Sequence, residues 1–238
     1  MKSLYCIWSQ WRQLDVKEKS DVESSRYNFR ITMNINASLI NEFAWKKTQI
    51  LVVTKYFDVD TTNTYIKEFQ KFRQYIIWFW ENRIAQIIEK KLPREDLHFI
   101  WNIQSKEIKK IVEYCSYIHS VWNKKHYEYK SNTLQKKKVK IFLQVQLDLD
   151  KNIWFQENDI KNLLFEKIED EYIEIIGISG MWIAEFSREE KIQEFQYLRD
   201  IRDKNIPKWK ISAGTSRDYK IALEMNIDII RIWKKLFN

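Results

Sequence analysis

Short apolar runs along the chain alternate with stretches in which apolar residues recur at helical spacing. The clearest run, Gln49–Asp58 (QILVVTKYFD), lacks polar alternation at its start, which is typical of a strand buried on both faces. A second clear run, Lys140–Leu147 (KIFLQVQL), places Gln144 and Gln146 on one side of the pleat. Further strands are predicted at Tyr75–Phe79, His98–Trp101, Tyr117–Val121, Ile173–Met181, Trp209–Ser212 and Ile229–Ile232.

Helical patterns occupy the gaps between these strands. The apolar residues of Ser105–Cys115 fall on one helix face, and Ser187–Lys204 begins with a capping box that pairs Ser187 with Glu190. Other helices are predicted at Ile31–Ala44, Thr62–Phe72, Asn82–Lys91, Lys124–Leu134, Glu157–Asp170 and Ser216–Met225. Strands separated by helices predict a parallel sheet with right-handed crossovers, and eight strands close a barrel. The predicted fold class is therefore α/β, a single (β/α)8 TIM barrel.

The length and composition agree with one large soluble domain. The chain has 238 residues, of which 45% are hydrophobic and 31% charged. No apolar run approaches the roughly 20 residues that span a bilayer, and the N-terminus lacks the features of a signal peptide. Cys6 and Cys115 are too few for a disulfide framework or a metal site. We expect a cytoplasmic protein, with residues 1–30 as an N-terminal extension of uncertain structure and residues 31–238 as the barrel.

The net charge of +8 permits contact with nucleic acid but does not establish it. Basic residues are spread along the predicted helices and are mixed with acids. The one dense run, residues 136–140 (KKKVK), comes just before a strand and is typical of a solvated loop. Nucleic-acid binding is therefore not predicted as the main function.

Lys55 lies where the first predicted strand ends. In a barrel of this kind the chemistry lies at the carboxyl ends of the strands. Taken alone, a lysine whose amine reaches solvent from a strand end is the commoner arrangement. The alternative is an amine held in a pocket of low dielectric, where lysine forms Schiff bases with carbonyl compounds.

Eight stretches, read together, favour the second interpretation. They are ILVVTK (50–55), FWENR (79–83), HFIWNIQS (98–105), IHSV (118–121), FLQVQLD (142–148), IIGISGM (175–181), ISAGTSRDY (211–219) and IIRIWKKLF (229–237). In this order and spacing the chain resembles the pyridoxal-phosphate homeostasis proteins, single barrels akin to the N-terminal domain of alanine racemase. The resemblance covers about residues 31–238. It implies pyridoxal 5'-phosphate, a form of vitamin B6, as the cofactor.

The resemblance also implies roles for the ring end of the site. Lys55 forms the Schiff base, the internal aldimine, with pyridoxal phosphate. Arg231 faces the pyridine nitrogen and keeps it unprotonated, which weakens the electron sink. Asn82, with His98 behind it, lines the ring side. Each has an alternative: Arg231 pairs with a surface acid, Asn82 only caps a helix, and His98 is a core histidine.

The phosphate end is implied at two further strand ends. Thr215 and Ser216 hold the phosphate where a helix opens after the seventh strand. Trp233 and Lys234 complete the implied phosphate-binding site. The alternative for Ser216 is a simple N-cap.

Tryptophan stands where the family usually has glycine, at positions 45, 80, 101 and 233. The chain has 3 glycines and 11 tryptophans, whereas the average content predicts about 17 glycines. An indole at position 80 presses into the cofactor pocket, and one at position 233 takes space that the backbone needs near a phosphate. Our hypothesis is that many of these tryptophans are UGA codons that the organism reads as glycine.

The resemblance implies a pyridoxal-phosphate carrier for cofactor homeostasis and delivery to apoenzymes, with no established reaction and no catalytic residue. Racemases of this fold add a second domain that supplies a tyrosine base, and this chain ends at Asn238, after the last strand. We expect a monomer that binds no membrane. Two alternatives stay open: a racemase-like enzyme acting on a small amino acid, and a degenerate barrel that serves as a binding scaffold.

Overall fold

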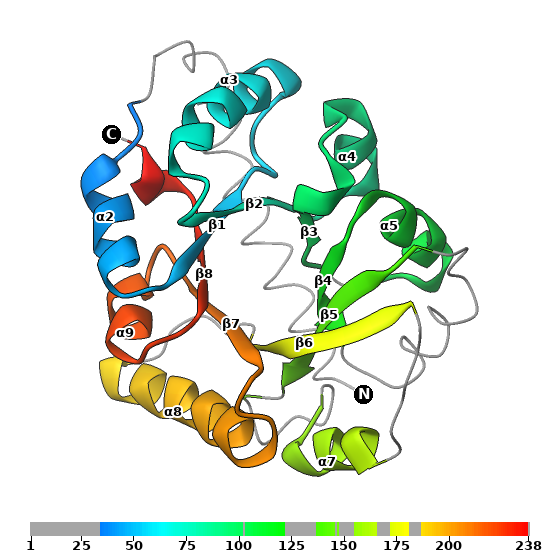
Figure 1. Cartoon of the computed structure of the whole chain (residues 1–238), viewed down its shortest axis with the longest axis vertical. Helices are drawn as coiled ribbons and strands as arrows, with labels where there is room; N and C mark the ends of the chain where they lie inside the picture. Colours follow the sequence, from blue (N-terminus) through cyan, green and yellow to red (C-terminus); the bar gives the residue numbers. More distant parts are fainter. Residues whose placement is uncertain are drawn as a thin grey trace, which may run out of the picture. The chain divides into compact units, whose positions relative to one another are not determined.

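The predicted strands pair in sequence order. In the computed structural model of the chain they form a closed parallel barrel, β1 to β8, in which β8 pairs with β1 (Figure 1). The structure describes residues 34–101, 103–121, 137–145, 147, 155–165, 172–180 and 187–237. The strands are β1 (Gln49–Val53), β2 (Ile76–Glu81), β3 (Leu97–Phe99), β4 (Tyr117–Val121), β5 (Val139–Val145), β6 (Ile173–Gly180), β7 (Lys210–Thr215) and β8 (Ile229–Ile232).

Burial explains why the first strand has no polar alternation. The four residues after Gln49 in β1 are buried, because one face of the strand packs inside the barrel and the other against helices. Leu51, Phe142 and Ile229 form a buried cluster with Ile100. At Gly177 of β6, a Cβ atom would lie 2.2 Å from the carbonyl oxygen of Lys210, so this strand contact requires a glycine.

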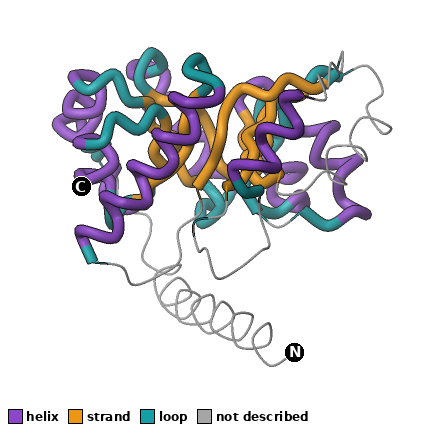
Figure 2. The backbone as a smooth tube through the Cα atoms, turned by 90° about the horizontal axis from the view of Figure 1, so that it is seen from below, coloured by secondary structure: helices purple, strands orange, loops and turns teal. Residues whose placement is uncertain are grey.

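Helices surround the strands, as Figures 1 and 2 show from two directions. The α-helices are α2 (Ala37–Trp45), α3 (Val59–Phe69), α4 (Ile84–Lys90), α5 (Ile108–Tyr114), α7 (Glu157–Phe165), α8 (Arg188–Asn205) and α9 (Tyr219–Glu224). Short 3-10 helices are η1 (Gln70–Phe72), η2 (Arg94–Asp96), η3 (Ser105–Glu107) and η4 (Lys234–Leu236). The predicted capping box at Ser187 and Glu190 opens α8 and is confirmed.

The prediction differs from the structure most clearly after the seventh strand. The helix predicted from Ser216 begins only at Tyr219, and β7 continues to Thr215. The reason is local, because the side chain of Asp218 accepts hydrogen bonds from Thr215 and holds residues 215–218 as a turn. The helix predicted at 124–134 lies outside the described residues, as do residues 31–33 and Met181.

The described residues from Ile35 onward form one compact unit. Residues 1–33 lie outside the described part, so the predicted extension stays a prediction. Among the residues that the structure describes, no helix combines the length and the apolar character that crossing a membrane requires.

Candidate functional site

Lys55 lies two residues beyond β1, at the carboxyl end of the barrel, and is half-buried. Its Nζ atom lies 4.7 Å from the ring centre of Tyr56, 5.1 Å from that of Trp80 and 5.6 Å from that of Trp101. Each distance is within the range of a cation–π contact. The amine therefore lies against three aromatic rings at the carboxyl end of the barrel.

A buried ion pair lies directly behind this lysine. Lys90 Nζ donates to Glu81 Oε1 (2.6 Å) and to the carbonyl oxygen of Thr54 (2.7 Å), and the Thr54 hydroxyl donates to the same Glu81 oxygen (2.7 Å). Burial raises the pKa of Glu81, while the positive charges of Lys90 and Lys55 oppose that rise. These contacts join the ends of β1 and β2 to α4 and hold the backbone that carries Lys55.

Arg231 of β8 is buried and holds the ends of two neighbouring strands together. Its guanidinium donates to the carbonyl oxygens of Gly180 at 2.6 Å and Gly214 at 3.3 Å. Gly214 has a φ of +83°, which favours glycine. Burial lowers the pKa of Arg231 to about 10, so the side chain is charged at neutral pH. The alternative in which Arg231 pairs with a surface acid is wrong.

The Trp80 indole lies against both cations of the site. Its ring centre is 5.1 Å from Lys55 Nζ and 5.9 Å from Arg231 Cζ. The indole Nε1 donates to the carbonyl oxygen of Ile100 (3.0 Å), and the ring packs on the buried barrel cluster. A flat aromatic ring therefore fits against Lys55 and Arg231 together, and here the chain supplies that ring itself.

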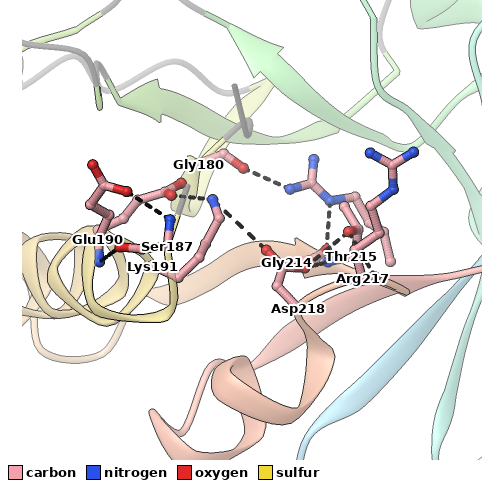
Figure 3. Close-up of polar contacts among 10 residues, drawn as sticks. Gly180, Ser187, Glu190, Lys191, Gly214, Thr215, Arg217 and Asp218 are labelled. Atoms are coloured by element: carbon pink, nitrogen blue, oxygen red, sulfur yellow. Dashed lines mark hydrogen bonds and ion pairs between the residues drawn. The ribbon is translucent and has the colours of Figure 1, made fainter. Parts of the chain in front are cut away.

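The turn after β7 is held by one carboxylate. Asp218 Oδ1 accepts the Thr215 backbone N–H (2.6 Å) and the Thr215 hydroxyl (2.9 Å), as Figure 3 shows. Thr215 Oγ1 in turn accepts the N–H of Arg217 (3.3 Å). Both Thr215 donors thus serve the turn. The α9 N-cap is Asp218, so the alternative that Ser216 is an N-cap is wrong.

The end of β8 lies next to this turn. The backbone N–H of Trp233 donates to Ser216 Oγ (3.0 Å). This bond uses the oxygen as an acceptor and leaves the hydroxyl proton of Ser216 to be donated elsewhere. The Trp233 ring stacks on Tyr56 with 4.0 Å between ring centres, and Lys234 Nζ lies 4.9 Å from the Trp233 ring. Through Tyr56, this end is in contact with the surroundings of Lys55.

Asn82 directly follows β2 and is half-buried. The N-cap of α4 is Arg83, so the alternative that Asn82 only caps this helix is wrong.

His98 is a core histidine. Its Nδ1 lies 2.8 Å from His119 Nε2, and His119 Nδ1 lies 2.9 Å from Ser212 Oγ. Burial lowers the pKa of His98 to about 3 and holds the pKa of His119 well below its usual value. Both imidazoles are therefore neutral at physiological pH. They form a polar chain across the barrel interior.

Sequence reasoning missed the residues that support the site. Glu81 and Asp218 both lie inside stretches that carried the resemblance, FWENR and ISAGTSRDY, but neither was given a role. Lys90 and His119 were missed because their partners are distant in the chain. A carboxylate at the end of a buried strand was the available signal for Glu81.

The fold and the site define a class. The chain is a (β/α)8 TIM barrel of the alanine racemase N-terminal type, with a lysine and an arginine at its carboxyl end. Its sequence is similar to the pyridoxal phosphate homeostasis protein of Aquifex aeolicus (strain VF5), with 24% identity over 175 residues that cover 67% of this chain and 75% of that protein. This similarity confirms the resemblance predicted from the motifs. No family model matches the chain.

Solved structures show the same fold. PipY of Synechococcus elongatus PCC7942, solved with pyridoxal phosphate bound, has a TM-score of 0.67 and 21% identity, over 84% of this chain and 100% of PipY. The same protein without the cofactor has a TM-score of 0.68 and 22% identity, over 84% and 99%. Alanine racemase of Clostridium difficile 630 has a TM-score of 0.59 and 14% identity, over 88% of this chain and 59% of the racemase.

Proposed function

We propose that this protein binds pyridoxal 5'-phosphate as a Schiff base on Lys55 and contributes to cofactor homeostasis in the cytoplasm. The observation that carries the proposal is that Lys55 and Arg231 contact one flat ring at the carboxyl end of the barrel. The similarity to a pyridoxal phosphate homeostasis protein supports the same conclusion.

Each part of the cofactor has a fitting group in the chain. Bound pyridoxal phosphate supplies an aldehyde and an electron-poor ring. The amine of Lys55 would join the aldehyde carbon with loss of water. Arg231 would face the ring nitrogen and oppose its protonation, and Asn82 would line the ring side. This arrangement favours carriage of the cofactor over carbanion chemistry, because an unprotonated ring nitrogen is the weaker electron sink.

The phosphate would be held at the other end of the site. The Ser216 hydroxyl and the Lys234 amine are side-chain donors at this end, beside the backbone of Trp233. Thr215 contributes by holding the turn, because both of its donors bind Asp218. We therefore assign phosphate contact to Ser216 and Lys234, and support of the turn to Thr215.

The Trp80 indole occupies the place that a cofactor ring would take. The groups around it suit pyridoxal phosphate, so binding requires that the indole turn away or that residue 80 be smaller. The proposed carrier acts as a monomer that hands the cofactor to apoenzymes that need it. The scaffold alternative rests on the same indole, since a barrel closed by Trp80 holds no cofactor.

The test is a titration of the purified protein with pyridoxal phosphate, followed by absorption. Borohydride reduction and peptide mapping then locate the modified lysine. The parent chain and Trp80→Gly are compared with Lys55→Ala and with Lys67→Ala, which removes an exposed lysine of α3.

We expect an absorption band that maps to Lys55, is lost in Lys55→Ala and persists in Lys67→Ala. No band in either the parent or Trp80→Gly overturns the proposal and leaves the scaffold alternative. Proton exchange at the α-carbon of an added amino acid would instead establish the racemase-like enzyme.

A further inference from the structure

A chain of buried charges runs from α8 to the turn after β7. Lys191 of α8 is 3% exposed, and its amine pairs with Glu194 and lies 3.9 Å from Asp218 Oδ2. Figure 3 shows this amine reaching from α8 toward Asp218. A lysine buried this fully needs an anionic partner. The attraction between Lys191 and Asp218 therefore holds Asp218 against α8.

The same carboxylate determines the shape of the turn. Asp218 Oδ1 accepts both the N–H and the hydroxyl of Thr215, at 2.6 Å and 2.9 Å. The next residue, Ser216, receives the N–H of Trp233 at 3.0 Å. Asp218 thus controls the backbone that presents Ser216 and, through it, the end of β8. Asp218 Oδ2 has no hydrogen-bond partner among the described residues, so its contact with Lys191 is electrostatic.

We propose that Asp218, anchored by Lys191, is a positioning residue that preorganises the Thr215–Ser216 turn to receive the phosphate group of the cofactor. This inference rests on the proposed function. Asp218 does not bind the phosphate, because like charges repel. It determines where the Ser216 hydroxyl and the Trp233 backbone lie before the ligand arrives, which lowers the cost of ordering them on binding.

The phosphate dependence of this role provides the test. Dissociation constants for pyridoxal phosphate and for pyridoxal, which lacks the phosphate, are measured for the parent, Asp218→Ala, Thr215→Val and Asp200→Asn. Asp200 is an exposed acid of α8 and serves as the matched control. In parallel, hydrogen exchange of the Thr215 amide is measured without any cofactor.

We expect Asp218→Ala to weaken the binding of pyridoxal phosphate about tenfold to a hundredfold, which corresponds to the free energy of a charge-assisted hydrogen bond. The affinity for pyridoxal should change by less than about twofold. Thr215→Val should show a smaller effect in the same sense, and Asp200→Asn none. The Thr215 amide should exchange faster in Asp218→Ala.

Two results overturn the inference. Equal losses for both ligands in Asp218→Ala mean that Asp218 supports the whole barrel, and the proposed function then stands. If the hydrogen-exchange rate of the Thr215 amide and both affinities are unchanged in Asp218→Ala, Asp218 has no positioning role at the site. If Asp218→Ala does not fold, Thr215→Val decides between the same outcomes. If neither the parent nor Trp80→Gly binds either ligand, the proposed function itself is overturned, and with it any phosphate role of Asp218.

Discussion

The guanidinium carbon of Arg231 lies 5.9 Å from the ring centre of Trp80. The amine of Lys55 faces the same ring, with its Nζ atom 5.1 Å from the ring centre. One indole from the end of β2 therefore stands where two strand-end cations, from β1 and β8, converge. Whether this side chain can leave determines what the barrel binds.

Replacing Trp80 should open the site. A ligand must displace the indole, and moving a large apolar side chain out of its packed position costs about 1.5–3 kcal/mol. We expect Trp80→Ala to bind pyridoxal phosphate about tenfold to a hundredfold more tightly than the parent. Absorption titration measures this, with Trp45→Ala as the control, since Trp45 is 85% exposed. Equal affinities would mean that the indole does not compete with the cofactor.

The hypothesis of UGA read as glycine has a direct test. The codons at positions 80 and 233 are read from the gene. The protein is also isolated from its own organism, and the masses of its peptides are measured by mass spectrometry. UGA codons with glycine in the peptides would make the open site the natural one. UGG codons would refute the hypothesis and make Trp80 a true occupant of the site.

The ion pair behind Lys55 should be costly to break. Glu81 and Lys90 are buried and bonded at 2.6 Å, so Lys90→Met leaves an unpaired buried carboxylate. We expect it to lower the free energy of unfolding by about 3–5 kcal/mol. The double variant Glu81→Gln with Lys90→Met should recover part of that loss. Urea denaturation measures the parent, Glu81→Gln, Lys90→Met and the double variant, and additive losses would show that the two residues do not act as a pair.

Arg231 should stabilise the barrel even without a cofactor. Its guanidinium satisfies the carbonyl oxygens of Gly180 and Gly214, and Arg231→Met leaves both without this donor. Each unsatisfied buried group costs about 1–3 kcal/mol, so for the two carbonyls we expect a loss of about 2–6 kcal/mol in urea denaturation. A stability equal to that of the parent would show that water reaches these carbonyls.

Acid should destabilise the barrel through its buried histidines. Below pH 6.5 the unfolded chain protonates these imidazoles, whereas folded His98 stays neutral to about pH 3. Stability therefore falls as the pH drops from about 6.5 toward 3, by up to about 1.4 kcal/mol per pH unit for each histidine. His98→Gln should reduce the dependence of the unfolding free energy on pH by up to about 1.4 kcal/mol per pH unit, the contribution of one histidine. Above pH 7 the substitution should not alter this pH dependence. Urea denaturation across this pH range checks it, and an unaltered slope would contradict the neutral assignment.

Local pattern was enough for most of the fold. β4 and β8 have the predicted bounds, and the capping box of α8 lies at the predicted residues. These features depend on neighbours a few positions away in the chain. The prediction was wrong where a side chain changes the backbone of residues just before it, as Asp218 does at Thr215.

The sequence by itself determined the order of the elements, the barrel and the position of Lys55 at a strand end, because hydrophobic periodicity is a local property. Only the tertiary structure decided which charges are paired. Glu81 meets Lys90, Arg231 meets the carbonyl oxygen of Gly180, and Lys191 approaches Asp218. Burial makes each of these groups depend on a partner, and closure of the barrel selects that partner from another element. The resemblance placed an indole at position 80 in the pocket, but it did not predict the contact of Trp101 with Lys55. Trp101 follows β3, which comes near the end of β1 only because both strands pair with β2.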